Sequence, residues 1–559
     1  MPFLAWPRPT RDSLRKDVWA GVSVALLLIP QSIAYAALAG MPPETGLYAA
    51  MLPAVVGILW GSSPLLAVGP VALTSLLTFA SLQPLARPGS VEWVHLAVWL
   101  AIHAGAIQLA LGALRLGAVA HFVSQPVVAG FVNAAALIIL LSQLPALLGL
   151  PAPLDAAAWG RLDETVRGEP WRLLTTAAFG LSALAFLLLH KRRWPRVPGV
   201  LVVCAAGIGV SVATGFQGLG GAVVGAVPHG LPALGALPSI GLDQHRALLP
   251  AAVIVALISF TEALSSCRTL PRTGATAWDE NQELIGQGLA KIASGASGAF
   301  PVSGSFSRSS LNVYVGATSG WSTLVCAACV TACTLWGGSL LSPLPTAVLA
   351  AIVIAPVLTL IDLRVFRRIW RVSRDDGVVA VLTFGATLAT VPQLQWGVLA
   401  GTVASILCYL YRRSRPRIVE VGLHPDGVLR DRRLHGLPPV APHVLAVRMD
   451  AGISYVTAPQ LERFVTERLR QTPGTRTVLL CCSAINDIDA TGVETLRAIH
   501  RQVGRDAVAL HFSGVKHQVH QVLASGEVAM TLAGSRFFRT DREALEALGT
   551  DGPPWVASP

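Results

Sequence analysis

A single arginine ends a run of small and hydroxyl residues in a chain that is otherwise dominated by apolar stretches. The run reads Pro301, Val302, Ser303, Gly304, Ser305, Phe306, Ser307 and Arg308. A charge at membrane depth is costly and is usually functional. Pro301 and Gly304 interrupt the apolar pattern where a helix can restart, so a helix N-terminus, several hydroxyls and a guanidinium would meet there. This combination of donors suits an anion.

A second interruption of the same kind occurs early in the chain. It reads Gly69, Pro70, Val71, Ala72, Leu73, Thr74 and Ser75. It follows the start of the first span by about as much as Gly304 follows the span that starts near Leu248, which predicts an inverted repeat of about 7+7 spans. Halves with an odd number of crossings run in opposite directions. Two half-helices would therefore point their N-termini at each other near the midplane.

The N-termini of these half-helices would help to hold an anion without full-length charged walls. Each N-terminus offers unpaired N–H donors and a charge of roughly +0.5. Thr74, Ser305 and Ser307 can add hydroxyl donors beside Arg308. The alternatives are that Gly and Ser only let helices approach closely, and that Arg308 snorkels to lipid headgroups or pairs with a structural carboxylate.

Four further polar residues lie within apolar spans. Glu262 can carry a proton, or it can be the structural partner of a cation such as Arg308. Gln31 and Tyr35 share one helical face, and they either line the same cavity or pack against a neighbouring helix. His103 is a lone imidazole, for which packing is the expected role.

The composition is that of an integral membrane protein. Hydrophobic residues fill 53% of the 559 positions, charged residues fill 13%, and the mean hydropathy is +0.59. Much of the net charge of +11 lies in short basic clusters beside apolar spans, so nucleic-acid binding is not expected. No cofactor, metal site, disulfide framework or Walker-type phosphate loop is expected, and Cys481 and Cys482 should point to opposite faces of a strand.

The basic clusters set the expected topology. Up to Tyr411 the chain offers candidates for about 14 crossings. The clusters are Arg8 to Lys16, Lys191 to Arg196, Arg364 to Arg374 and Arg412 to Arg417. An even number of crossings separates each cluster from the next, so all of them share one side, which should be the cytoplasm. We therefore expect a multi-pass protein of a cell (inner) membrane with cytoplasmic N- and C-termini, and external loops at 151–169 and 216–244.

The composition changes after Arg417. We expect a transmembrane domain over 1–417, a linker or leading strand over 418–442, a soluble α/β domain over 443–549 and a disordered tail over 550–559. Within the soluble domain, the pattern predicts strands at 444–447, 477–480 and 508–512 and helices at 458–470 and 491–503.

Four stretches together resemble the sulfate permease (SulP) family of anion transporters, and the resemblance covers nearly the whole chain. They are residues 30–36 (Pro-Gln-Ser-Ile-Ala-Tyr-Ala), 69–72 (Gly-Pro-Val-Ala), 281–290 (Asn-Gln-Glu-Leu-Ile-Gly-Gln-Gly-Leu-Ala) and 301–308. The resemblance implies about fourteen spans divided into core and gate domains, a substrate site between the half-helices of the third and tenth spans, and elevator-like movement of the core.

The resemblance also implies roles for single residues. Ser307 and Arg308 match central positions of the family's anion site, Gln31 and Tyr35 match cavity-lining positions, and Glu262 matches an acidic position on the eighth span. Some members carry Asp on that span and couple to sodium, so Glu262 favours proton coupling or exchange. The stretch 267–272 is more basic than the family pattern. The complete predicted substrate-binding set is Gln31, Tyr35, Val71, Ala72, Thr74, Gly304, Ser305, Phe306, Ser307 and Arg308.

The soluble domain resembles STAS, a domain of sulfate transporters and anti-sigma factor antagonists. Its stretch Asp489-Ala490-Thr491-Gly492 matches the loop that carries a phosphorylatable hydroxyl in the antagonists. Thr491 holds that position and is the predicted regulatory residue, and the alternative role is a turn or a helix N-cap. In transporters this domain supports dimerisation and trafficking, so the resemblance implies a homodimer.

The sequence therefore predicts a secondary active transporter of a small anion, and not an enzyme. Its substrate can be sulfate, bicarbonate, chloride or a dicarboxylate, and it would work by proton symport or anion exchange within a lipid bilayer. Two other functions stay open. One is a channel-like or voltage-sensing protein whose site binds an anion without a transport cycle, and the other is a signalling scaffold that acts through its STAS domain.

Overall fold

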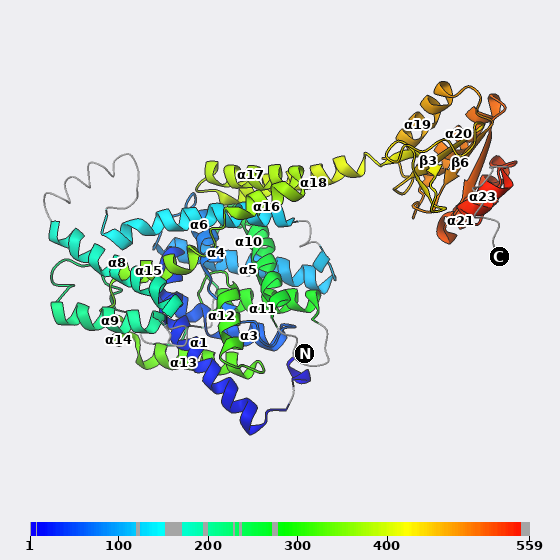
Figure 1. Ribbon diagram of the computed structural model, residues 1–559. Helices are drawn as coiled ribbons and strands as arrows, with labels where there is room; N and C mark the ends of the chain where they lie inside the picture. The colour runs from blue at the N-terminus through cyan, green and yellow to red at the C-terminus, as the bar shows by residue number, and fades with distance from the viewer. Residues whose placement is uncertain are drawn as a thin grey trace. The chain divides into compact units, whose positions relative to one another are not determined.

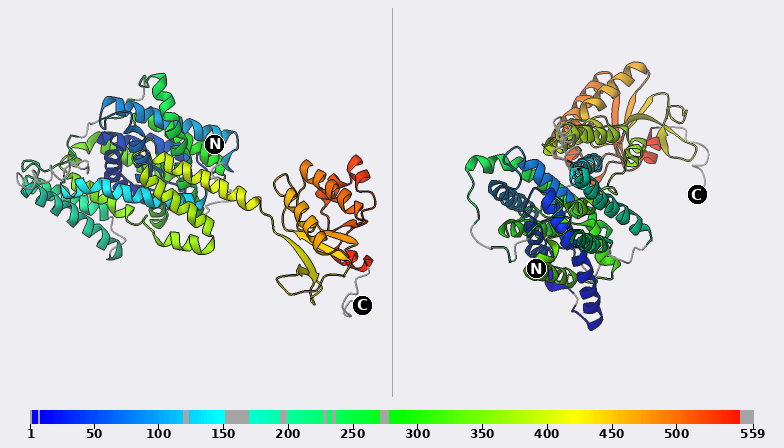
Figure 2. Two further views of the ribbon diagram at one scale, coloured as in Figure 1. Left: turned by 90° about the horizontal axis from the view of Figure 1, so that it is seen from above. Right: turned by 90° about the vertical axis from the view of Figure 1, so that its left-hand side faces the viewer.

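The computed structural model describes residues 2–6, 8–118, 123–150, 170–193, 199–226, 230–233, 237–270 and 278–548. The chain divides into two compact units, Met1–Ile406 and Leu407–Pro559. The first unit is built of helices and the second is an α/β domain (Figures 1 and 2). The predicted external loop 151–169, Arg196, Arg272 and the predicted tail 550–559 lie outside the described residues.

Helices and two short strands make up the first unit. Its first half contains η1 (Pro2–Ala5), α1 (Arg11–Leu38), α2 (Pro43–Ala49), α3 (Leu52–Trp60), β1 (Val68–Gly69), α4 (Ala72–Leu82), α5 (Val91–Ala113), α6 (Gln125–Leu148), α8 (Pro170–Arg193) and α9 (Gly199–Thr214). There follow α10 (Leu242–Thr269), α11 (Glu280–Ala296), β2 (Ser303–Gly304), α12 (Phe306–Tyr314), α13 (Trp321–Trp336), α14 (Gly338–Leu341), α15 (Thr346–Val357), α16 (Arg364–Val372), α17 (Arg374–Ala389) and α18 (Leu394–Arg413), the last of which continues past the unit boundary at Ile406.

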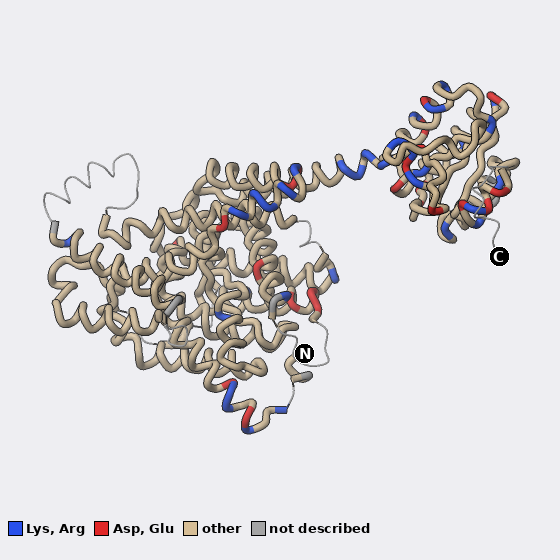
Figure 3. The backbone as a smooth tube through the Cα atoms, in the orientation of Figure 1, with Lys and Arg blue, Asp and Glu red and all other residues tan. Residues whose placement is uncertain are grey.

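Helix length separates full spans from shorter helices. Among the described residues, α1, α5, α6, α8, α10 and α18 are long and apolar enough to cross a membrane, whereas the apolar helices α4, α9, α13 and α15 are shorter. At 1.5 Å per residue, α4 rises about 17 Å, which is roughly half of a hydrocarbon core of about 30 Å. Figure 3 shows charged residues to be sparse in this unit and dense in the second. The count of about 14 crossings stays a prediction.

Glycines let α11 pack tightly on α3 and α5. An ideal Cβ on Gly288 would lie 2.6 Å from the backbone N of Leu109 in α5. One on Gly286 would lie 2.5 Å from the Cα of Gly61, which caps α3. A larger residue at either position would push the helices apart, because backbone atoms cannot move aside as a flexible side chain can. The stretch 281–290 is therefore a helix-packing surface.

The second unit is a six-stranded sheet flanked by helices. Its strands are β3 (Ile418–Leu423), β4 (Leu429–Asp431), β5 (Val444–Met449), β6 (Thr477–Cys481), β7 (Ala509–Ser513) and β8 (Phe537–Phe538). Its helices are α19 (Ala458–Gln471), α20 (Ala490–Arg505), α21 (His517–Leu523), α22 (Gly526–Thr531) and α23 (Asp541–Ala547). The order is β4-β3-β5-β6-β7-β8, with β5 to β8 parallel and β3 antiparallel to both neighbours. The three predicted strands and two predicted helices correspond to β5, β6, β7, α19 and α20.

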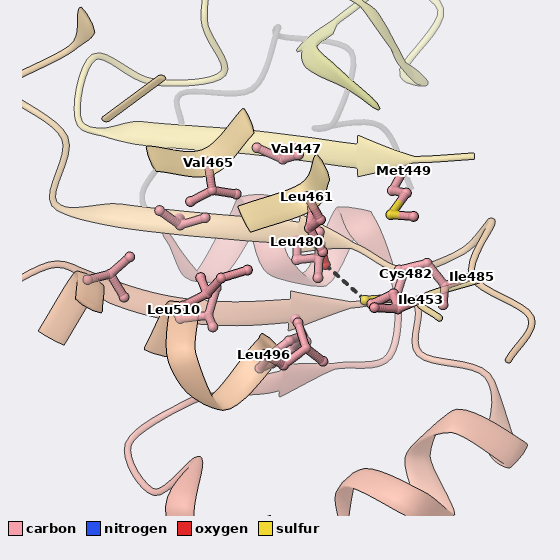
Figure 4. Packing of buried hydrophobic residues seen from close by; sticks show 14 of the residues in the cluster. Val447, Met449, Ile453, Leu461, Val465, Leu480, Cys482, Ile485, Leu496 and Leu510 are labelled. Carbon is pink, nitrogen blue, oxygen red and sulfur yellow. Dashed lines mark hydrogen bonds between the residues drawn. The ribbon is translucent and has the colours of Figure 1, made fainter. Parts of the chain in front are cut away.

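Each face of this sheet buries an apolar cluster. Figure 4 shows the larger cluster, in which Leu480 and Leu510 pack with Cys482. Cys481 lies in the cluster on the other face, together with Leu479. The two cysteines therefore point to opposite faces, as predicted from strand geometry. Burial raises the pKa of the Cys481 thiol to about 12, so the thiol stays neutral and fills space.

The region predicted as a linker or leading strand, 418–442, belongs to the sheet over its first part. Residues 418–420 pair with β5 and 421–423 pair with β4. The pairing satisfies backbone groups that a free linker would leave to water. The sheet thus begins at Ile418, before the predicted boundary at 443.

Candidate functional site

The two short helices α4 and α12 start side by side because the strands before them pair. Val68 of β1 lies opposite Gly304 of β2 in an antiparallel pair. The backbone N–H of Ser305 donates to the carbonyl of Ala67 at 2.9 Å, and the N–H of Ala67 donates to Oγ of Ser309 at 2.8 Å. These contacts join segments more than two hundred residues apart in sequence. The two half-helices expected from the sequence thus begin next to each other.

A cavity of about 530 Å³ opens at these two helix starts. Seven residues of the predicted site and coupling group line it, namely Tyr35, Val71, Ala72, Glu262, Ser305, Phe306 and Ser307. Thr261, Ser265 and Thr359 add hydroxyl groups to the lining. The remaining lining is largely apolar and comes mainly from α6 and α15. Weakly hydrated walls of this kind strengthen the interaction of an anion with the few donors present.

Four predicted residues do not line this cavity. Gln31 lines a second cavity of about 920 Å³, which shares Ser307 and Thr359 with the first. Thr74 is fully buried, and its Oγ1 donates to the carbonyl of Val71 at 3.2 Å. Gly304 sits within β2, where its backbone pairs with β1.

Arg308 is the fourth of these residues, and it is 1% exposed. Its Nη1 donates to the carbonyl of Pro70, just before α4, at 2.7 Å. Its Nε and Nη2 have no partner among the described residues, and the side chain lines a void of about 10 Å³ together with Asn312 and Cys326. The guanidinium therefore connects α12 to the residue before α4, and it does so beneath the residues that line the cavity.

The two helix starts differ in their caps. Ser305 caps α12, because its hydroxyl accepts from the backbone N–H of Arg308 at 3.4 Å and also lies 3.3 Å from Oγ of Ser307. The N-cap of α4 is Val71, which offers no side-chain acceptor. The first N–H groups of α4 therefore keep their donor capacity for a ligand in the cavity.

Glu262 brings a carboxyl group from α10 to the same cavity. Its Oε2 is buried without a hydrogen-bond partner in the described part of the chain. Arg308 and Lys291 are the cations that interact with it electrostatically, but neither forms an ion pair with it among the described residues. The described part of the chain therefore does not contain the ion pair between Glu262 and Arg308 that the sequence left open as an alternative.

Thr491 lies in the first turn of α20 with its side chain exposed. The N-cap of that helix is Asp489, whose Oδ1 accepts from the N–H of Gly492 at 2.8 Å. Its Oδ2 accepts from the N–H of Tyr455 at 2.8 Å. The capping role considered for Thr491 therefore falls to Asp489, and the threonine hydroxyl faces solvent.

Sequence reasoning missed two buried polar clusters in the first unit. Lys291 is fully buried on α11, and its Nζ donates to Oε1 of Gln108 on α5 at 2.9 Å. Asp17 on α1 accepts hydrogen bonds from the backbone and hydroxyl groups of Thr318 and Ser319, just before α13. For Lys291 the signal was a charge inside a largely apolar run, the same signal that singled out Arg308, whereas Asp17 directly follows Arg15 and Lys16 at the edge of the first span and carried no such signal.

His103 has an imidazole partner that the sequence did not reveal. Its Nε2 lies 3.2 Å from Nδ1 of His245, and Trp99 contacts both rings. The packing role expected for His103 agrees with this cluster.

Comparisons with known proteins agree with the arrangement. The model of the sulfate permease family matches residues 14–383, and the STAS domain model matches residues 438–544. A probable sulfate transporter of Mycobacterium tuberculosis is 30% identical over 96% of both chains. The sodium-independent sulfate anion transporter of Bos taurus is 30% identical over 98% of this chain and 91% of its own.

Two solved structures share the fold. Murine solute carrier 26 family member A9, an anion transporter solved in the inward-facing state, superposes with a TM-score of 0.86 at 22% identity, covering 98% of this chain and 93% of that one. The transmembrane domain of the cyanobacterial bicarbonate transporter BicA superposes with a TM-score of 0.60 at 23% identity, covering 71% of this chain and 98% of that one.

Proposed function

Because the chain belongs to the sulfate permease family of anion transporters, we propose that it carries a small oxyanion across the membrane through the cavity at the starts of α4 and α12. Family membership confirms that the chain is a multi-pass membrane transporter with a STAS domain, and not an enzyme. Sulfate and bicarbonate are the first candidate substrates, since the names of the relatives contain them. The observation that carries the proposal is the meeting of two helix starts, several hydroxyls and a carboxyl in one cavity.

The anion would be held by backbone and hydroxyl donors at the cavity surface. The free N–H groups of α4 and the hydroxyls of Ser305 and Ser307 would contact it directly. Arg308 would act from behind by holding the Pro70 carbonyl and by adding one positive charge in a region of low dielectric. Because the guanidinium would not touch the anion, it would attract the anion without binding it too tightly for release.

Glu262 would be the coupling group. When it takes up a proton, it removes one negative charge from beside the anion, so proton and anion stabilise each other in the cavity. This linkage makes symport the first expectation, and exchange follows if Glu262 keeps its proton throughout the cycle.

We further propose the topology predicted above, with about 14 crossings in two inverted halves and both termini in the cytoplasm. An elevator-like movement would carry α4 and α12 together, because the β1–β2 pair and the Arg308–Pro70 contact tie them into one body. The STAS unit would support a homodimer, and Thr491 would be its accessible modification site.

Uptake into proteoliposomes tests this proposal. Labelled sulfate and bicarbonate would be offered with and without an inward proton gradient to the wild type, to Glu262→Gln and to Glu92→Gln as a matched control at an exposed carboxylate. We expect gradient-stimulated uptake by the wild type and the control, and loss of the stimulation in Glu262→Gln. Uptake by all three proteins that ignores the gradient would retain transport but refute coupling through Glu262. Absence of uptake of both anions by the wild type would refute the substrate class.

A further inference from the structure

A short amphipathic helix with one strongly basic face lies between α15 and α17. Helix α16 has nine residues, so it rises about 14 Å and is too short to cross a bilayer. It packs against α17 and α6, and the Phe366 ring contacts the Phe384 ring of α17 at 5.6 Å between centroids. Its position between two apolar helices of a membrane unit places it at a membrane surface.

The basic face consists of four arginines at helical spacing. Arg364, Arg367, Arg368 and Arg371 follow the i, i+3, i+4, i+7 pattern and are all exposed. None of the four forms an ion pair with a carboxylate in the part of the chain that the structure describes. Figure 3 shows blue positions gathered along the segment that Figure 1 labels α16.

The acidic residues beside the helix do not neutralise this face. Asp362 precedes it and accepts from the backbone N–H of Arg364, so this contact involves the main chain and not the guanidinium. Asp375 and Asp376 follow in the first turn of α17, and both have partners. Four guanidinium groups therefore stand together with their charge uncompensated by the side chains that the structure describes around them.

Large apolar residues are exposed on both edges of the arginine face, with Leu363 and Trp370 on one edge at i, i+7 spacing and Val372 on the other. Leu363 is 64% exposed, Val372 is 84% exposed and Trp370 is 47% exposed. Water is a poor environment for three such side chains, whereas the boundary between headgroups and acyl chains accommodates both apolar residues and tryptophan. The adjacent guanidinium groups would then lie at the level of the lipid phosphates.

We propose that α16 is an interfacial helix that binds the phosphodiester headgroups of anionic lipids through Arg364, Arg367, Arg368 and Arg371. Arginine suits this partner because its planar fork donates two parallel hydrogen bonds to phosphate oxygens. A soluble polyanion would satisfy the charges but would leave Leu363, Trp370 and Val372 exposed to water. The charge and the exposed apolar residues on either side of it together select a lipid. This inference is independent of the substrate and coupling proposed above.

Lipid retention by the full chain tests the proposal. Purified protein would be mixed with equal amounts of phosphatidylglycerol and phosphatidylcholine in detergent, and the bound lipids would be counted by native mass spectrometry. The test variant changes all four arginines of α16 to glutamine. The control variant makes the same change of charge at Arg433, Arg463, Arg470 and Arg501, which are exposed in the second unit.

We expect the wild type to retain phosphatidylglycerol in preference, and the α16 variant to lose that preference by about fivefold or more. The control variant should keep it within about twofold, because its arginines lie outside the membrane unit. Equal losses in both variants, or an unchanged preference in the α16 variant, would overturn the proposal.

Two further measurements keep the test decisive if the glutamine variant folds poorly. Replacement of the four arginines by lysine keeps the charge and should keep most of the preference. Raising the salt concentration to about 1 M should weaken the preference of the wild type, since the Debye length falls to about 3 Å. A preference that ignores salt would overturn the proposal without any variant.

Discussion

Helices α4 and α12 start in similar surroundings but bring different chemistry to the cavity. Each follows one strand of the same antiparallel pair. The N-cap of α4 is Val71, whose side chain cannot accept a hydrogen bond from the helix start. The N-cap of α12 is Ser305, whose hydroxyl accepts from the backbone N–H of Arg308. At the cavity, α4 presents Val71, Ala72 and Leu73, while α12 presents Ser305, Phe306 and Ser307. The two helices therefore start from a similar backbone arrangement but offer different hydrogen-bond donors to the cavity.

The difference separates two ways of binding an anion. Helix α4 contributes backbone N–H groups whose direction is fixed by the helix, and its apolar side chains keep water away from them. Helix α12 contributes hydroxyls that can rotate to suit the ligand, together with the buried cation. Arg308 joins the two sets, because it belongs to α12 and donates to the carbonyl that precedes α4.

The largest effect is expected from Arg308→Ala. The change removes the buried charge and leaves the Pro70 carbonyl without its partner, so anion affinity should fall about tenfold or more. Isothermal titration with sulfate or bicarbonate would measure the loss, and Arg308→Lys should recover part of it because the charge is kept. Arg246→Ala, at an exposed arginine of α10, is the control for folding and charge. Wild-type affinity in Arg308→Ala would show that α12 does not supply the cation of the site.

Ser307→Ala should have the next largest effect. Its hydroxyl lines the cavity and is exposed, so a water molecule can replace it in part, and we expect a loss of affinity of about fivefold. Ser182→Ala, on α8 away from this cavity, provides the matched control. If Ser307→Ala binds as tightly as the wild type while Arg308→Ala does not, then α12 contributes its charge but not the hydroxyl of Ser307.

The positions of both half-helices and their approach to each other could be predicted from the sequence, but the strand pair and the hydrogen bond that join them could not. Pro and Gly among hydroxyl residues stand out in an apolar chain, so the breaks at Gly69 and Gly304 were visible. The pairing of β1 with β2 involves two residues on each strand, which is too short for any periodic pattern. The side chain of Arg308 reaches Pro70 because the two strands pair, so its direction could not be predicted from the sequence alone.

The same limit applies to the missed polar contacts. Lys291 and Gln108 are 183 positions apart and meet because glycines bring α11 close to α5. In the second unit, short and nearly continuous apolar runs located β5, β6 and β7, because parallel strands that are buried on both faces leave that signal. Strands β3 and β4 were not separated from a linker, because Gly and Pro interrupt their region and β4 has three residues.

Ala72→Pro tests the backbone donors of α4 and should have a smaller effect. Proline is tolerated at the first position of a helix, and Val71 already has the extended backbone that proline requires before it. The change removes one N–H from the helix start and leaves those of the next residues, so we expect a loss of affinity of about threefold. Val91→Pro makes the same change at the start of α5 and should leave affinity unchanged. An equal affinity for Ala72→Pro and the wild type would mean that α4 provides shape and no donor.

The smallest effects should come from the paired strands, and they should differ in kind. A Cβ on Gly304 would lie 2.9 Å from a methyl of Leu66 and 3.1 Å from Cβ of Ala263, both buried, so Gly304→Ala should lower stability by about 1 kcal/mol. A Cβ on Gly69 would lie 3.3 Å from Nη2 of Arg308, so Gly69→Ala should displace the guanidinium slightly and weaken anion binding by about twofold with little change in melting temperature. Gly385→Ala, with open space around it, is the control for both measurements. If Gly69→Ala lowered the melting temperature and left affinity intact, the strand pair would support the fold alone, and the link from β1 through Arg308 to the anion would have to be given up.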